Sequence, residues 1–183
     1  MSEIEGLLRA YEQFVRLPWD RTLAGPQKVW SAIYDANQER RLRLRVPEFK
    51  VATESAGHGW HAIDLTDTFA VWMAGQEYRE SYFEEPDNLD SALEGYTVYI
   101  ENLVLQFLQK PEVDENSVVA IVGIGSLFGL TFASALLEKV GPSIPGRLLV
   151  FFPGQHTGHN YRLLDARDGW NYTAIPITAS SEN

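Results

Sequence analysis

Residues 118–126 read Val-Val-Ala-Ile-Val-Gly-Ile-Gly-Ser, an apolar run that ends in a glycine-rich turn. Five consecutive apolar residues are typical of a strand that is buried on both faces, as in a parallel sheet covered by helices on both sides. After the turn we expect a helix over about 129–140, which Gly141 and Pro142 would end. This succession of strand, turn and helix favours an α/β fold.

The flanking sequence repeats the alternation of strands and helices. Strand-forming residues predict further strands at 29–35, 60–65, 147–152 and 172–177, and a short one at 161–164. Helical spacing predicts helices at 4–15, 36–56 with a break at Pro47, around 67–73, and at 88–109. The irregular stretch 153–171 is either a long loop or a partly formed hairpin.

These elements predict a single three-layer α/β/α domain over residues 1–179. Its mainly parallel sheet would have about five strands, Rossmann-like or similar to a degenerate P-loop domain without Walker motifs. We expect residues 180–183 to be a frayed tail.

The charge of the 183-residue chain is uneven. The net charge is −10, and residues 51–115 contain 14 acidic and 2 basic residues, whereas residues 1–50 contain 7 and 9. A pI near 4.8 disfavours direct binding to nucleic acid or to an anionic membrane.

The number of cysteines and the N-terminal sequence indicate where in the cell the protein is located. The chain has no cysteine, which excludes disulfides, thiol catalysis and Cys-based metal sites. The acidic N-terminus lacks the layout of a signal peptide, and the longest apolar run is too short to span a bilayer. We therefore expect a cytoplasmic protein that needs no membrane.

The carboxyl ends of the predicted strands carry aspartates. Ligands of open α/β sheets bind beyond these ends, and two or three carboxylates there could hold Mg²⁺ for phosphoryl transfer. The candidates are Asp35, Asp64 and Asp67. The alternative is that Asp67 caps a helix while the other two bind turn backbone.

The glycine-rich turn is a candidate ligand or anion site. Glycines let a backbone approach phosphate, and a helix N-terminus attracts anions. The candidate residues are Gly123, Gly125, Ser126 and Gly129. However, their G-x-G-x-x-x-G spacing is one residue longer than the dinucleotide pattern, and no Walker lysine follows. A structural tight turn is the alternative.

Histidines suggest two weaker sites. The pairs His58/His61 and His156/His159 could bind metal, the second pair together with Asp165. A triad could join Ser126, His156 and Asp165, but the G-x-S-x-G elbow is missing. Surface or capping roles are the alternative for all four histidines.

Charged and aromatic residues suggest protein interfaces. Arg40, Arg41, Arg43 and Arg45 could contact an acidic partner or a phosphate backbone, or form a solvated helix face. The acidic run around Pro86 includes Glu84 and Glu85 and could contact a basic surface. An aromatic and arginine cluster near the C-terminus could provide interface hot spots or seal the core. Its members proposed for an interface are Phe152, Tyr161, Arg162 and Trp170.

Several segments, spread over nearly the full length of the chain, resemble the BrxB family of bacterial BREX antiphage systems. They are Phe14-Val-Arg-Leu-Pro-Trp19, Leu23-Ala-Gly-Pro-Gln27, Tyr78-Arg-Glu-Ser-Tyr-Phe-Glu-Glu-Pro86, Gly123-Ile-Gly-Ser-Leu-Phe-Gly129, Phe151-Phe-Pro-Gly154 and Asn160-Tyr-Arg-Leu-Leu164. The most specific are Gly-Ser-Leu-Phe-Gly and Phe-Phe-Pro-Gly. The chain departs from the family at residues 170–176, where many relatives are more basic.

The resemblance implies an accessory subunit of a phage-defence system that associates with the phosphatase-like protein PglZ. We therefore expect a non-enzymatic subunit without a cofactor, which binds PglZ or another BREX component. The alternatives are a degenerate nucleotide-binding domain and an Asp-based Mg²⁺ phosphohydrolase. Weaker still is DNA binding through the arginines of residues 40–45.

Overall fold

The computed structural model describes residues 1–164, 170–171 and 173–179, so the predicted tail at 180–183 lies outside the described residues. The strands are β1 (Val29–Tyr34), β2 (Gly59–Asp64), β3 (Ser117–Val122), β4 (Arg147–Thr157), β5 (Asn160–Leu163), β6 (Trp170–Asn171) and β7 (Ile175–Ile177). The α-helices are α1 (Glu3–Val15), α2 (Glu39–Ser55), α3 (Thr68–Ala74), α4 (Arg79–Glu84), α5 (Leu93–Leu108) and α6 (Ala133–Val140). The short 3₁₀ helices are η1 (Gly25–Lys28), η2 (Ala36–Gln38), η3 (Pro86–Leu89), η4 (Ile124–Leu127) and η5 (Gly141–Ser143).

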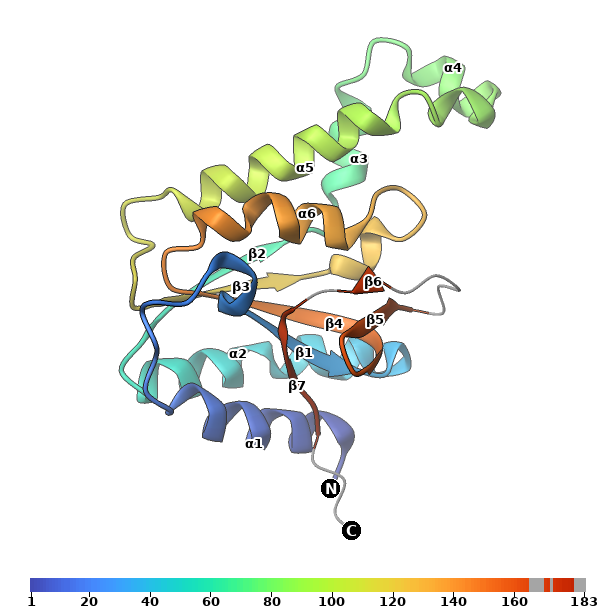
Figure 1. Cartoon of the computed structure of the whole chain (residues 1–183). Coiled ribbons are helices and arrows are strands. Elements are labelled where there is room, and N and C mark those ends of the chain that lie inside the picture. The colour runs from blue at the N-terminus through green and yellow to red at the C-terminus, as the bar shows by residue number, and fades with distance from the viewer. Residues whose placement is uncertain (165–169, 172, 180–183) are drawn as a thin grey trace.

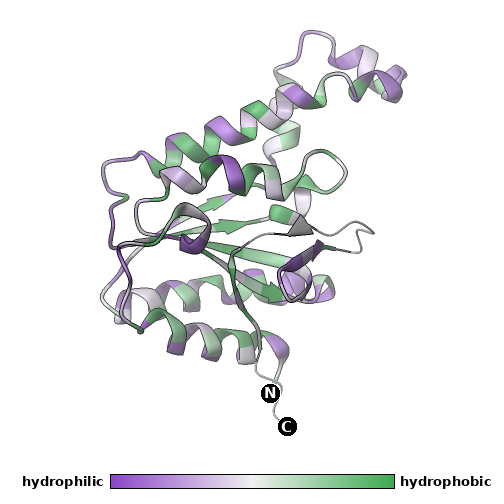
Figure 2. Ribbon diagram, viewed as in Figure 1, coloured by the Kyte–Doolittle hydropathy of each residue, from purple (hydrophilic) through white to green (hydrophobic). Residues whose placement is uncertain are grey.

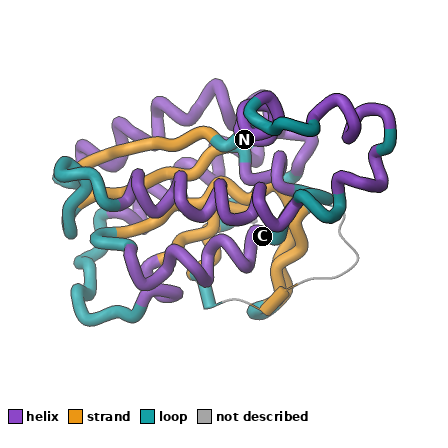
Figure 3. The backbone as a smooth tube through the Cα atoms, turned by 90° about the horizontal axis from the view of Figure 1, so that it is seen from above, coloured by secondary structure: helices purple, strands orange, loops and turns teal. Residues whose placement is uncertain are grey.

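The sheet confirms the predicted α/β fold. Within the described residues, its main strands lie in the order β2-β3-β4-β1-β7, and each of these neighbours pairs in parallel. In β3 and β4, Val118 lies opposite Arg147 and Ile121 opposite Val150. Helices lie above and below this sheet (Figure 1), and the view from above shows them running along the strands (Figure 3).

The alternation of side chains along β3 explains the two helical layers. Val118, Ala120 and Val122 belong to the core between the sheet and helices α1 and α2. Val119 and Ile121 belong to the core shared with α3, α5 and α6. Successive strand residues point to opposite faces, so the apolar run of β3 is buried on both sides, as its sequence predicts.

Two predicted boundaries are wrong. Helix α2 is continuous through Pro47, because Leu42 and Phe49 on either side of the proline are both fully buried and pack in the same core. The helix expected over about 129–140 begins only at Ala133, and the glycine turn leads into η4 instead.

Within the stretch expected to be a long loop or a partly formed hairpin, residues 153–163 form a hairpin. Strand β4 continues to Thr157, and β5 returns antiparallel to it, with Gly154 opposite Leu163. The turn between them includes Gly158, whose φ is +62°. The hairpin therefore extends from the carboxyl end of β4.

A segment that we call the acidic arm, residues 77–94, includes α4 and η3 and ends in the first turn of α5. It projects from the layer of α3 and α5, away from the sheet (Figure 1), and is largely hydrophilic (Figure 2). Tyr82 and Leu89 are partly buried against the core, which attaches the arm to the domain.

Candidate functional site

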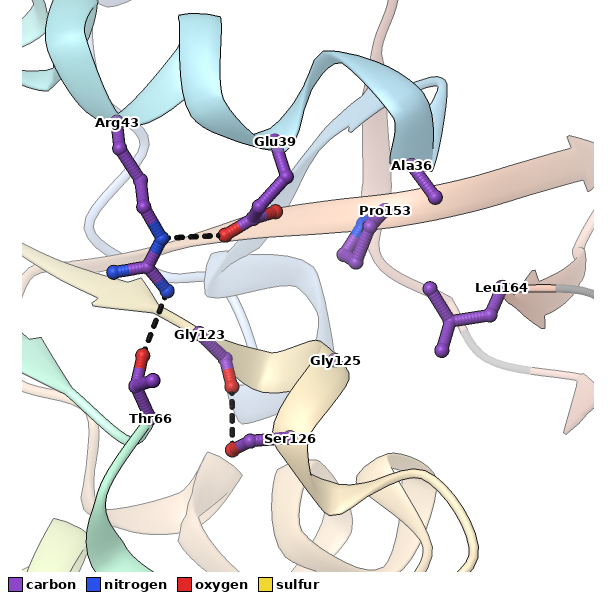
Figure 4. Close-up of a pocket in the computed structure, with 9 residues that line it drawn as sticks. All are labelled: Ala36, Glu39, Arg43, Thr66, Gly123, Gly125, Ser126, Pro153 and Leu164. Carbon is purple, nitrogen blue, oxygen red and sulfur yellow. Dashed lines mark hydrogen bonds and ion pairs between the residues drawn. The ribbon is translucent and has the colours of Figure 1, made fainter.

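A cavity of about 230 Å³ lies at the carboxyl edge of the sheet. It is lined by residues that follow β1, β2, β3 and β5 and by Pro153 within β4 (Figure 4). The lining residues are Ala36, Glu39, Arg43, Thr66, Gly123, Gly125, Ser126, Pro153 and Leu164. This is the edge where open α/β sheets bind ligands.

Arg43 is the centre of the polar contacts at this edge. From α2 its guanidinium donates to Glu39 (Nε to Oε1, 2.7 Å) and to Asp64 (Nη1 to Oδ2, 3.0 Å). It also donates to the Thr66 hydroxyl (Nη2 to Oγ1, 2.6 Å). Burial lowers the pKa of Arg43, but its bonds to the two carboxylates outweigh burial and raise that pKa above its ordinary value. Arg43 thus joins α2 to the turn after β2.

Asp64 and Thr66 form a tight turn after β2. The Asp64 carboxylate accepts from the Thr66 backbone N–H (2.9 Å) and from the Thr66 hydroxyl. Burial raises the pKa of Asp64, but the hydrogen bonds from Thr66 and Arg43 outweigh it and hold this pKa below its ordinary value. Asp64 is therefore an ionised acceptor held by its neighbours.

Glu39 is also held, because the buried Tyr34 hydroxyl donates to its Oε2. Burial and the adjacent carboxylate raise the pKa of Tyr34, which keeps its proton on the phenol. The single positive charge of Arg43 is thus shared by the carboxylates of Glu39 and Asp64. An anionic ligand that entered the cavity would meet little uncompensated positive charge.

Backbone geometry and close packing explain why glycines occupy the turn after β3. Gly123 has φ +78°, and a Cβ there would lie 2.8 Å from the Asp64 carboxylate and would also meet the Thr66 hydroxyl. The Ser126 hydroxyl donates to the carbonyls of Leu65 (3.0 Å) and Gly123 (2.8 Å). Gly129 also has positive φ, with open space where a Cβ would be. Since α6 begins at Ala133, no α-helix starts directly after Gly123 and Gly125, and an anion site there stays a prediction.

The three aspartates do not come together. Asp35 follows β1 and accepts from the Asn37 N–H, whereas Asp64 is the last residue of β2. Since β4 and β3 lie between those strands, the two strand ends are three spacings apart, about 14 Å. Asp67 is exposed and precedes α3 without a side-chain capping bond. Residues 1–164, 170–171 and 173–179 contain no group of three His, Cys, Asp or Glu side chains that could hold a metal ion.

The two histidine pairs lie apart, and His61 of the first pair lies within β2, opposite Val119. At the amino edge, His58 stacks on Trp19 (centroids 3.7 Å apart) and its Nδ1 contacts Asn116 Oδ1 (2.7 Å). His156 and His159 lie in and next to the β4–β5 hairpin. Asp165, which the predicted triad and metal site require, lies outside the described residues.

The four arginines of α2 do not form one patch. Arg43 faces the carboxyl edge, and Arg45 pairs with Glu48 (Nε to Oε1, 2.7 Å). Arg40 and Arg41 are exposed, and Arg41 makes a weak bond to Gln38 (3.4 Å). Two arginines are therefore left to present positive charge to a partner.

The predicted aromatic interface is partly wrong. Phe152 and Tyr161 are buried and pack edge to face, with ring centroids 5.7 Å apart. The Tyr161 hydroxyl donates to the Ala174 carbonyl (2.7 Å), so these rings seal the core beneath the hairpin. Arg162 is exposed. Trp170 pairs with Tyr161 through β6, which places its backbone beside the hairpin.

The sequence interpretation missed Tyr34, Glu39 and Thr66. Two local signals could have found the last two: Glu39 and Arg43 have the i, i+4 spacing of helical ion pairs, and Asp64-Leu-Thr66 has the spacing of an Asx turn. The contact between these two units depends on tertiary structure. No family model matches this chain, and neither the curated proteins nor the solved structures that were compared with it contain a significant match.

Proposed function

We propose that this chain is a non-enzymatic assembly subunit of a BREX-type antiphage system, which binds PglZ or another BREX component. Besides the sequence resemblance to BrxB, one structural observation supports the proposal. Three polar side chains at the carboxyl edge, where an α/β enzyme would act, are bonded to Arg43, namely those of Glu39, Asp64 and Thr66. Their geometry serves to join α2 to the sheet rather than to present a free acid, base or nucleophile.

In the described part of the chain, no helix combines the length and apolar character that a membrane span requires. Separately, the charge of the acidic arm favours a protein partner over nucleic acid. The projecting acidic arm would repel the phosphates of nucleic acid, whose binding depends on positive charge.

Co-purification with the BREX proteins of the same operon tests the proposal. Tagged chain should retain PglZ, or another BREX protein, through washes at moderate salt. Retention of none of these proteins, under conditions in which the chain is folded, would contradict the assembly role. A matched control is an unrelated tagged protein of the same size and charge, since a net charge of −10 can retain basic proteins without specificity.

A degenerate nucleotide-binding domain is the second candidate, and the cavity beside Gly123, Gly125 and Ser126 favours it. Thermal unfolding with ATP, GTP or NAD and Mg²⁺ tests this function. A ligand at a hundred times its Kd should stabilise the fold by about 2.7 kcal/mol. No change in Tm across the set would rule out this candidate.

A further inference from the structure

The acidic arm exposes two aromatic side chains, Tyr78 directly before α4 and Phe83 within it. None of the six residues of α4 is buried, and Tyr78 and Phe83 are each 65% exposed. Meanwhile Tyr82 and Leu89 pack partly against the core. The arm is thus attached by one set of side chains and exposes another, although exposure of a large aromatic ring to water is unfavourable.

The segment that contains these two aromatic residues is strongly acidic. The arm contains seven acidic residues, all exposed: Glu77, Glu80, Glu84, Glu85, Asp87, Asp90 and Glu94. Its one basic residue, Arg79, is engaged with Glu80 (3.4 Å) and with the Ala74 carbonyl (2.8 Å). Within residues 77–94, therefore, the local field is strongly negative, and Figure 2 shows the projection as predominantly hydrophilic.

We propose that the arm is a docking surface for a Lys- or Arg-rich segment of a partner protein, with Tyr78 and Phe83 as its apolar anchors. This inference rests on the proposed assembly function and names its surface. Aromatic rings are frequent binding hot spots when a partner covers them. Complementary charge at the rim accelerates association and selects the partner.

Charge distinguishes this occupant from the others. An anionic lipid surface or a nucleic acid would be repelled by the seven carboxylates. The densest basic cluster of a second copy is Arg40–Arg45 of α2, and there Arg43 and Arg45 are already paired within the chain.

The test measures binding of purified PglZ to the wild-type chain and to two variants, each with two substitutions. Tyr78→Ser with Phe83→Ser removes the anchors, and Glu84→Lys with Asp87→Lys reverses part of the charge. The matched controls are Leu44→Ser with Val51→Ser on α2, where exposed apolar residues are lost from another surface, and Glu138→Lys on α6. Thermal unfolding verifies that each variant is folded.

We expect the anchor variant to weaken binding by at least about tenfold, as loss of a hot spot does. The charge variant should slow association by about tenfold at about 0.1 M salt and lose most of its salt dependence. Both controls should bind like the wild type. If PglZ does not bind the wild type but another BREX protein does, that protein replaces it in the same comparison.

The outcomes separate the two proposals. If the wild-type chain binds no BREX protein, both the assembly role and the docking surface are refuted. If it binds but the arm variants bind equally well, or the α2 control loses as much affinity, only the docking surface is refuted. Light scattering adds a further outcome: self-association of the wild type that the anchor variant abolishes would identify a second copy as the occupant and overturn the basic-partner inference.

Discussion

Arg43 of α2 and Asp64 at the end of β2 are joined by an ion pair of 3.0 Å (Nη1 to Oδ2), 21 residues apart in the chain. This contact fixes the carboxyl end of an edge strand to a helix that crosses one face of the sheet. The same guanidinium holds Glu39 and Thr66, so a single side chain connects the first turn of α2 to the turn that follows β2.

Arg43→Ala should lower the free energy of unfolding by about 1–2 kcal/mol, because it removes charge-assisted bonds and leaves two carboxylates facing each other. The value is moderate because the side chain is 34% exposed, and water partly replaces the lost bonds. Urea unfolding measures the change. Arg40→Ala, at an exposed position of the same helix, should stay within about 0.5 kcal/mol of the wild type. Equal effects of the two substitutions would contradict the role of Arg43.

The Asp64 contacts predict a specific dependence on pH. The folded pKa of Asp64 lies below its ordinary value, so its ionised form stabilises the fold above the unfolded pKa of about 4. That contribution is lost as pH falls through the folded pKa. Wild type should therefore be more stable than Asp64→Asn at pH 7, and the difference should shrink in acid.

Urea unfolding of both proteins at several pH values between about 7 and 3 measures this difference. Asp67→Asn is the matched control, because Asp67 is exposed and makes no side-chain capping bond. Its stability should follow the wild type throughout. A difference between wild type and Asp64→Asn that stays constant down to pH 3 would show that the ionised carboxylate is not what stabilises this turn.

Substitution by alanine should lower the Tm by different amounts at Gly123 and at Gly129. Both have positive φ, which disfavours alanine by about 1–2 kcal/mol. At Gly129 a Cβ enters open space, whereas at Gly123 it would collide with the Asp64–Thr66 turn. Gly123→Ala should therefore lower the Tm clearly more than Gly129→Ala. Equal losses would show that the turn moves away from the new methyl group without strain.

Patterns within single elements predicted most of the fold. The apolar run of β3 identified a strand buried on both faces, and the alternation along the chain identified the parallel sheet. The errors arose where tertiary packing overrides a local signal. Leu42 and Phe49 hold α2 together across Pro47, and Phe152 is buried because β4 is a central strand with both faces covered.

The candidate site was predictable only in pieces. Asp64 and Gly123 were both identified, because each lies at the carboxyl end of a predicted strand. Their contact depends on the parallel pairing of β2 with β3, which places Asp64 opposite Val122. Neither periodicity nor composition specifies that Arg43, rather than another arginine of α2, turns toward this edge. That choice follows from the position at which the buried face of α2 rests on the sheet.

The Tyr161 hydroxyl connects the β4–β5 hairpin to the segment before β7, and this contact can be tested by substitution. It is buried and donates to the Ala174 carbonyl (2.7 Å), just before β7. Burial raises the pKa of Tyr161 to about 12, so the proton stays on the oxygen over the pH range in which the fold is stable. Tyr161→Phe keeps the ring but leaves the carbonyl without this donor, which should lower the free energy of unfolding by about 1–2 kcal/mol. Tyr78→Phe, at an exposed ring, should change it by less than about 0.5 kcal/mol. If chemical unfolding finds the two substitutions equal, the hydroxyl contributes nothing to the attachment of β7.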